Sequence, residues 1–192
     1  SVSPIAYRLH PDIVPLPLAL ALSTLIAYLG WRLRALTGLG ALVADLVGTS
    51  IASATGWAGL AALGAFFIGS SVISRLAPDR GAERFDSKGN QRDQWQVLAN
   101  GGAAALAALV LGPAALPVVT ISLAAAAADT WATAFGGWSR TLPRHILTGR
   151  PVPAGTSGGV TLLGTAGAGL GATLVGLASA AVAGIAVAVA IA

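Results

Sequence analysis

The chain has 192 residues, of which 55% are hydrophobic and only 9% are charged, and its mean hydropathy is +0.79. About a quarter of the residues of a soluble domain are charged, so this composition excludes a soluble domain and indicates a polytopic membrane protein. The absence of cysteine excludes disulfides, thiolate zinc sites and thiol catalysis. The net charge of +4 comes from basic residues between the apolar runs, so it indicates membrane topology rather than nucleic-acid binding.

Apolar runs close to the length of a bilayer crossing follow one another along the chain. They predict an all-α transmembrane helix bundle with six or seven spanning helices, in a single domain over residues 1–192. The expected spans are residues 13–30, 36–54, 57–74, 96–111 and 115–135, and then 160–192 as one tilted helix or two short ones broken near 176–179. Short turns at Thr55-Gly56 and Gly112-Pro113 predict antiparallel neighbours.

Two polar segments, at about residues 75–95 and 138–158, separate the spans. The first contains nine of the eighteen Asp, Glu, Lys and Arg residues. If the spans alternate in direction, ten of the eleven Lys and Arg residues lie on one side of the membrane and only Arg8 lies on the other. The positive-inside rule then predicts an integral protein of the cell (inner) membrane, with both basic loops cytoplasmic and the N-terminus outside.

Asp129 is the first candidate site residue, because it is the only ionisable side chain between Leu98 and Ser139. In a helix over residues 115–137, Asp129 and Thr133 share a face and Thr130 lies beside them. One carboxylate and two hydroxyls suit Mg²⁺, which takes its other ligands from substrate phosphates and water. The alternative interpretation is an acid that pairs with a basic loop residue and holds the bundle together.

A second candidate set is Arg92, Gln96 and Asn100, whose spacing predicts one face of a helix that enters the membrane from the cytoplasm. Arg92 suits a phosphate, and the two amides suit a nucleotide or a metal-bound water. A hydrogen-bonded seam between helices is an equally good interpretation.

The third candidate is the segment before the last apolar run, which holds Gly155, Thr156, Ser157, Gly158, Gly159 and Thr161. Backbone N–H groups at the start of a helix suit an anion. The segment has no Walker ending, and clusters of this composition are usually turns. The segment is a candidate because it is expected to lie on the same side of the membrane as Arg144, Arg150 and Asp129.

The remaining polar residues are weaker candidates. Asp45 lies midway along the second span, where pairing with an arginine or a hydroxyl is the simpler explanation. Hydroxyls such as those of Ser70, Ser71 and Ser74 ordinarily bond back to their own helix. His10 and His145 have no ligand spacing, so zinc is not expected.

Three motifs occur together: Gln-Val-Leu-Ala-Asn-Gly-Gly (96–102), Ala-Asp-Thr-Trp-Ala-Thr (128–133) and Gly-Thr-Ser-Gly-Gly-Val-Thr (155–161). With Gly-Trp-Ala-Gly-Leu (56–60), they resemble the integral membrane family that contains phytyl-phosphate kinase, described as domain of unknown function ninety-two. The resemblance covers nearly the whole chain. The pattern of residues 129–133 is also similar, more distantly, to that of dolichol and phytol kinases and membrane cytidylyltransferases.

The resemblance implies a kinase that converts a phytyl or polyprenyl monophosphate to the diphosphate, with Mg²⁺ and a nucleoside triphosphate, CTP being preferred to ATP. We therefore expect Asp129 to hold Mg²⁺ with Thr130 or Thr133. Arg92, Lys88 and Arg144 would neutralise phosphates, the segment 155–161 would bind one phosphate, and Asn100 and Gln96 would orient the donor. The chain departs from the family pattern at Ala134 and Ser157, where an acid and an asparagine are common.

Two other functions fit the same residues. A lipid-phosphate cytidylyltransferase would form a CDP-lipid and release pyrophosphate. A small transporter or channel would use the intramembrane acid for a solute, and a homodimer could complete its pathway.

Overall fold

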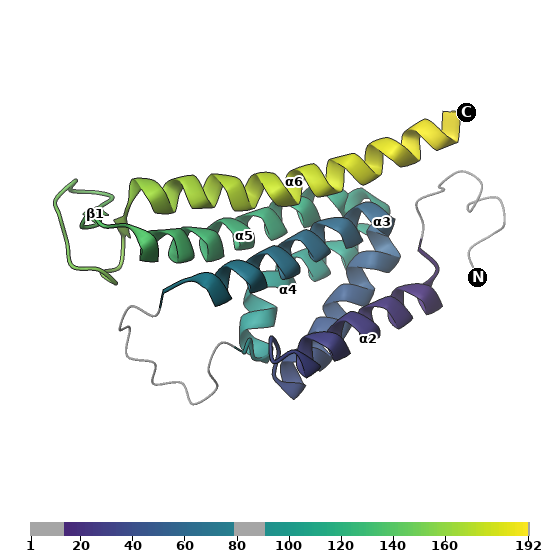
Figure 1. Cartoon of the computed structure of the whole chain (residues 1–192). Helices are drawn as coiled ribbons and strands as arrows, with labels where there is room; N and C mark the ends of the chain where they lie inside the picture. The colour runs from purple at the N-terminus through teal and green to yellow at the C-terminus, as the bar shows by residue number, and fades with distance from the viewer. Residues whose placement is uncertain (1–13, 79–90, 192) are drawn as a thin grey trace.

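The computed structural model describes residues 14–78 and 91–191, and in these ranges the chain is almost entirely helical (Figure 1). The helices are α2 (Leu16–Arg32), α3 (Gly38–Leu76), α4 (Gln94–Leu111), α5 (Leu116–Trp138) and α6 (Leu162–Ile191), and the short 3₁₀ helix η1 (Gly112–Ala115) joins α4 to α5. Two strands of two residues each, β1 (Arg144–His145) and β2 (Gly159–Val160), form an antiparallel pair in the polar segment before α6. Apart from this small pair, the all-α class predicted from the sequence is confirmed.

Within the described residues, three helical stretches are long and apolar enough to cross a membrane: Gly38–Leu76, Gln94–Trp138 and Leu162–Ile185. Helix α2 is apolar but shorter, with 17 residues. The length and composition of these helices are those of an integral membrane protein.

Helix α3 is divided at Gly56, whose φ of 65° and ψ of −153° lie outside the helical region. Glycine tolerates this conformation because it has no Cβ. Figure 1 shows two arms that leave this point in different directions, and a Cβ built on Gly48 in the first arm would lie 3.5 Å from the side chain of Leu63 in the second. The sequence therefore located the break correctly.

A similar change of direction separates α4 from α5. Gly112 has a φ of 56°, and Pro113 follows it in η1, so the α-helix cannot continue through this point. Helix α6, by contrast, runs without interruption from Leu162 to Ile191, so the break considered near residues 176–179 does not occur.

Helices α5 and α6 lie side by side because glycines on α6 leave room for side chains of α5 (Figure 1). A Cβ on Gly167 would lie 2.6 Å from Cγ of Phe135, and one on Gly171 would lie 2.8 Å from Cγ of Trp131. A hydrogen bond of 3.0 Å between the hydroxyls of Thr120 and Ser179 also joins the two helices. Small residues of this kind allow close packing where the surrounding lipid is as apolar as the helices.

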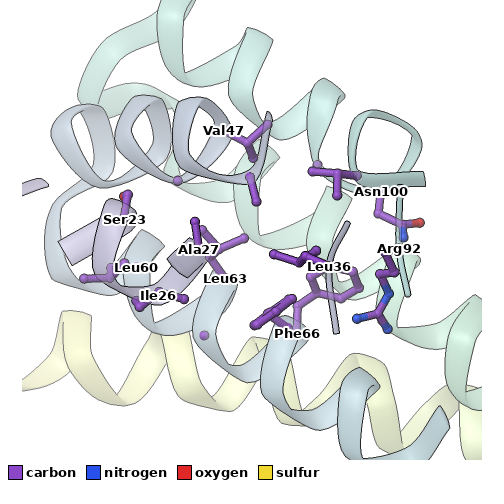
Figure 2. Close-up of a pocket in the computed structure, with 16 residues that line it drawn as sticks. Ser23, Ile26, Ala27, Leu36, Val47, Leu60, Leu63, Phe66, Arg92 and Asn100 are labelled. Atoms are coloured by element: carbon purple, nitrogen blue, oxygen red, sulfur yellow. The ribbon is translucent and has the colours of Figure 1, made fainter. Parts of the chain in front are cut away.

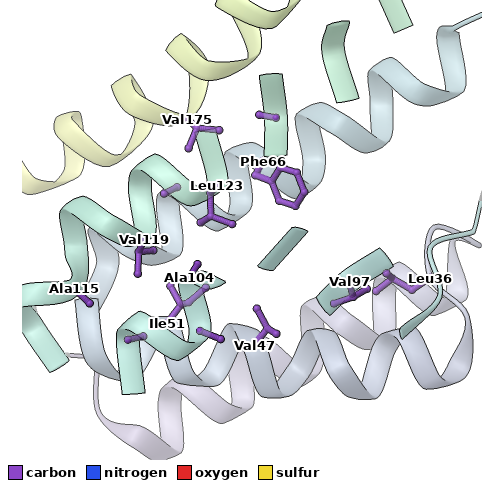
Figure 3. Close-up of a cluster of buried hydrophobic side chains, with 14 residues drawn as sticks. Leu36, Val47, Ile51, Phe66, Val97, Ala104, Ala115, Val119, Leu123 and Val175 are labelled. Atoms are coloured by element: carbon purple, nitrogen blue, oxygen red, sulfur yellow. The ribbon is translucent and has the colours of Figure 1, made fainter. Parts of the chain in front are cut away.

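The apolar core lies between the two arms of α3 and helices α4, α5 and α6 (Figure 3). Its buried side chains include Val47, Ile51, Phe66, Leu123 and Val175, with alanines filling the space between them. The core therefore fixes the relative positions of the helices that carry the candidate site residues.

We expect Gly167→Ala and Gly171→Ala to destabilise the protein by about 1–3 kcal/mol each, because the new methyl groups must displace aromatic side chains and backbone of α5. Gly169→Ala is the matched control, since a Cβ there meets nothing within 4 Å and alanine favours helix. Thermal unfolding in detergent, followed by circular dichroism, measures the difference. Equal stabilities for all three variants would contradict the glycine packing.

Candidate functional site

Asp129 lies on the side of α5 that does not pack against the bundle. The residue is exposed, whereas Ala127 and Ala134, on the opposite side of the helix, are buried. In the described residues its carboxylate makes no side-chain hydrogen bond or ion pair. The carboxylate is therefore accessible to a ligand, and it lies about 14 Å along the helix axis from Trp138 at the end of α5.

The two hydroxyls near Asp129 bond to their own helix. Thr130 donates to the carbonyl oxygen of Ala126 and Thr133 to that of Asp129, both at 3.0 Å. Their lone pairs remain, but one carboxylate and two hydroxyls are too few to hold a resident ion alone. Residues 14–78 and 91–191 contain no group of three His, Cys, Asp or Glu residues that could bind a metal. The set fits a Mg²⁺ ion that arrives with phosphate ligands of its own.

Arg92 does not lie on the same helix face as Gln96 and Asn100, because α4 begins at Gln94, after the N-cap Asp93. The predicted helix face is therefore wrong for Arg92. Its backbone is extended and pairs with the linker between α2 and α3 instead. Arg92 N donates to the carbonyl oxygen of Ala35 at 2.9 Å, and Thr37 N donates to that of Arg92 at 3.0 Å.

The side chain of Arg92 is fixed by contacts with α3. Its Nη1 donates to Oγ of Ser71 at 2.8 Å, and its guanidinium lies 5.9 Å and 6.0 Å from the ring centroids of Phe66 and Phe67. Burial, and to a lesser degree the positive charge of Arg75, lower the pKa of Arg92 below its ordinary value. An arginine remains charged under these conditions. The result is a half-buried positive charge in a defined position.

Gln96 has a structural partner that the sequence analysis did not find. The Asp93 carboxylate accepts from the backbone N–H groups of Trp95 and Gln96, and Oε1 of Gln96 accepts from Asp93 N. This is a capping box, and the Asp-x-x-Gln spacing was its signal in the sequence. Gln96 therefore starts α4, and its side chain is exposed.

Asn100 and Arg92 lie at one end of a cavity between α2, α3 and α4 (Figure 2). The cavity has about 680 Å³ of empty space, its mouth included. Its other lining residues are apolar or small: Ser23, Ile26, Ala27, Leu36, Ala44, Val47, Gly48, Leu60, Leu63, Gly64, Phe66, Phe67, Val97 and Gly101. The Asn100 amide makes no hydrogen bond to the described residues. The cavity is therefore apolar along its walls and polar at the Arg92 end.

Ser23 lies on α2 away from the Arg92 end of this cavity (Figure 2). It is 4% exposed, and its hydroxyl has no hydrogen-bond partner. The side chain is small enough to pack over Gly48, where a Cβ would lie 2.9 Å from Ser23 Oγ. A larger residue at either position would close this end of the cavity.

The segment 155–161 forms turns and strand β2, and it ends at Thr161, the residue before α6. Thr156 N donates to the carbonyl oxygen of Pro153, and Gly159 N donates to that of Thr156. Oγ1 of Thr161 accepts from Gly164 N at 3.0 Å and so caps α6. Gly155, Ser157 and Gly158 lie in the exposed part of the turn. Part of the expected anion-binding backbone is therefore used within the segment itself.

The polar segment 138–158 contains three arginines, Arg140, Arg144 and Arg150, and all three are exposed. Arg144 donates from Nη1 to the carbonyl oxygen of Gly149 at 2.9 Å, within the β1–β2 hairpin. The structure shows no direct contact of either Arg144 or Arg150 with Asp129 or Arg92 in the described residues. Lys88 lies outside the described residues.

Asp45 lies on α3 and connects this helix to α2 through a side-chain hydrogen bond. Its carboxylate accepts from the hydroxyl of Thr24 on α2 at 3.0 Å and from that of Thr49 on α3 at 3.4 Å. The predicted pairing with a hydroxyl is confirmed.

Three residues near Arg92 were missed or set aside in the sequence analysis: Ser71, Ser74 and Arg75. Ser71 and Ser74 do not bond back to their helix: Ser71 accepts from Arg92, and the Ser74 hydroxyl makes no hydrogen bond within the described residues. Arg75 lines a small pocket with these serines, Ala35 and Arg92. The sequence signal was Ser71, Ser74 and Arg75 at spacings of three and four residues on one helix face.

Residues 21–192 match the protein family described as "Integral membrane protein DUF92". The chain belongs to this family. Among similar proteins of the family is "Protein PGR" of Arabidopsis thaliana, which is 32% identical over 167 residues, covering 76% of this chain and 57% of that protein. The chain thus spans less than two thirds of the length of this relative. No solved structure matches the chain.

The position of Arg92 depends on the absence of a side chain at Gly40, where a Cβ would overlap the carbonyl oxygen of Arg92 and lie 3.3 Å from the carbonyl carbon of Asp93. We expect Gly40→Ala to displace the Arg92 segment and to lower stability by about 1–3 kcal/mol. Gly38→Ala is the control, because a Cβ at that position meets nothing within 4 Å. Thermal unfolding in detergent compares the two variants, and a Gly40→Ala protein as stable as the control would refute the close packing.

Proposed function

We propose that this DUF92 protein is a prenyl-phosphate kinase, which converts a phytyl or polyprenyl monophosphate to the diphosphate. The observation that carries the proposal is the cavity with apolar walls and with Arg92 and Asn100 at one end. A ligand that complements both parts has an apolar tail and an anionic head. Prenyl phosphates have this composition, and ligand sites typically combine apolar walls with a few polar groups that orient the ligand.

In the proposed reaction, an oxygen of the lipid monophosphate attacks the terminal phosphorus of a nucleoside triphosphate. A P–O bond forms to the lipid phosphate as the bond to the bridging oxygen of the β-phosphate breaks, and the nucleoside diphosphate leaves. Phosphoryl transfer requires mainly positioning and neutralisation of charge. Arg92 supplies a positive charge held in place by Ser71, and Asn100 supplies an amide that is free to bind an oxygen of either phosphate.

The triphosphate enters with its Mg²⁺ ion, and CTP is the donor that we favour from the resemblance to dolichol and phytol kinases. Asp129, helped by Thr130 or Thr133, is the residue that would hold this ion. Lys88 and Arg144 would neutralise the donor phosphates. The exposed turn at 155–158 offers backbone N–H groups that the hairpin does not use.

The proposed topology has six crossings: α2, each arm of α3, α4, α5 and α6. The breaks at Gly56 and Gly112 divide helical stretches of 39 and 45 residues, which would be about 58 and 68 Å long if straight and thus far exceed a bilayer. The basic segments then share the cytoplasmic side of the cell membrane with the Arg92 end of the cavity, and the N-terminus lies outside.

The direct test uses the purified full-length protein with geranylgeranyl or phytyl monophosphate and Mg²⁺ salts of CTP, UTP, GTP and ATP. We expect the lipid diphosphate and a nucleoside diphosphate as products, identified by mass spectrometry. A CDP-lipid with pyrophosphate would show a cytidylyltransferase instead. Solute flux in liposomes without turnover of any lipid phosphate would show a transporter.

Cavity filling tests whether the lipid tail occupies the proposed place. Gly64 lines the cavity, and a Cβ there meets nothing within 4 Å, so Gly64→Leu places its side chain in the empty space with little strain on the fold. We expect KM for a C20 monophosphate to rise about tenfold or more, because displaced apolar tail loses roughly 0.8 kcal/mol per CH₂.

The control for this variant is Gly169→Leu on α6, where a Cβ also meets nothing within 4 Å but no cavity is lined. A five-carbon prenyl monophosphate serves as the second control, since its tail is short enough to avoid the new leucine. Identical KM values for the C20 substrate in both variants would place the lipid elsewhere.

A further inference from the structure

Arg92 lines a second and smaller pocket as well as the apolar cavity. This pocket has about 270 Å³ of empty space, mouth included, and its lining residues are Ala35, Ser71, Ser74, Arg75 and Arg92. It is therefore formed where the second arm of α3 faces the linker before α3 and the segment before α4. Two guanidinium groups and two hydroxyls are available in a space that suits a ligand of a few atoms.

The positive charge in this pocket is not neutralised by the described residues that line it. None of those residues is a carboxylate, and neither Arg75 nor Arg92 forms an ion pair within the described ranges. Each guanidinium has five N–H donors. Arg75 uses one on the carbonyl oxygen of Leu33 at 2.7 Å, and Arg92 uses one on Ser71 at 2.8 Å. Most of their hydrogen-bonding capacity remains for a ligand.

The pocket is also held in shape before any ligand binds. Arg75 is fixed to the linker through Leu33, and Arg92 is fixed to Ala35 through its backbone and to Ser71 through its side chain. The charge of Arg75 contributes to the lowered pKa of Arg92, so the two cations repel each other. An anion between them would relieve this repulsion, and little side-chain freedom would be lost on binding.

We propose that Ser71, Ser74, Arg75 and Arg92 form a binding site for a phosphate-type oxyanion. Guanidinium groups bind the oxygens of phosphate in pairs, and the serine hydroxyls add donors from α3. The inference goes beyond the proposed function, because a protein that binds phosphate compounds without transferring phosphate would also have this site. The oxyanion is either the head of the lipid or a phosphate separate from it, and the experiment distinguishes these sources.

A purely structural role for the two arginines is the competing explanation, since Arg75 donates to Leu33 in the α2–α3 linker and Arg92 donates to Ser71 on α3. A structural role predicts that Arg75→Gln lowers stability by the same amount with or without phosphate. An oxyanion site predicts that the variant loses the additional stability that phosphate gives to the wild-type protein. The dependence on phosphate therefore separates the two explanations.

The experiment measures thermal unfolding of the full-length protein in detergent, titrated with inorganic phosphate against chloride at constant ionic strength. We expect phosphate to stabilise the wild-type protein and Arg140→Gln, which changes an exposed arginine with no side-chain hydrogen bond in the described residues. In Arg75→Gln and Ser71→Ala, the Kd for phosphate is expected to rise about tenfold or more, since each variant loses a hydrogen bond to a charged ligand. Equal phosphate dependence in wild type and Arg75→Gln would overturn the proposal.

A second titration, in the presence of saturating geranyl monophosphate, identifies the source of the oxyanion. If the lipid phosphate abolishes the stabilisation by inorganic phosphate, the site holds the lipid head. If the two ligands stabilise additively, the site holds a phosphate separate from the lipid. Both outcomes need no catalytic turnover, so failure of the kinase assay and failure of this proposal are independent results.

Discussion

The candidate site depends on one backbone interaction, the pairing of the Arg92 segment with the linker between α2 and α3. Two hydrogen bonds, from Arg92 N to Ala35 and from Thr37 N to Arg92, satisfy polar groups that irregular chain would otherwise leave unpaired. Gly40 allows this approach because it has no side chain. The pairing places the guanidinium of Arg92 between the apolar cavity and the pocket that contains Arg75.

The apolar cavity and the close packing of α6 against α5 both depend on glycines, which have no side chain to occupy the space beside them. Where glycine meets an aromatic residue of the neighbouring helix, as at Gly167 and Gly171, the space is filled. At Gly64 a Cβ would meet nothing, and the space stays empty within the angle between the arms of α3. The kink at Gly56 sets this angle, so it places the two arms of α3 that form part of the cavity wall.

The sequence was sufficient for those features that depend on composition and local conformation. The all-α class, the breaks at Gly56 and Gly112 and the pairing of Asp45 with hydroxyls follow from apolar length, from residues that stop a helix and from the cost of a charge in lipid. Helical spacing alone predicted that Arg92 belongs to the helix that carries Gln96 and Asn100. In the structure this helix, α4, begins at Gln94, two residues after Arg92, because the capping box of Asp93 and Gln96 starts it there.

The parts of the site that the sequence missed depend on contacts between distant segments. Ser71 would ordinarily bond to its own helix, but Arg92, 21 positions away in the chain, donates to it instead. Arg75 was counted only as a basic loop residue, yet it donates to Leu33, 42 positions away. Periodicity within one helix contains no information about such partners.

The bridge between Leu36 and Arg92 also constrains the order in which the protein can assemble. All of α3 lies between these positions in the chain. The linker can therefore pair with the Arg92 segment only after both arms of α3 have been synthesised. Once formed, the bridge closes this whole stretch into a loop, which costs only slightly more entropy than closing a loop of half that length. The site around Arg92 can therefore form only after about the first half of the chain has been synthesised.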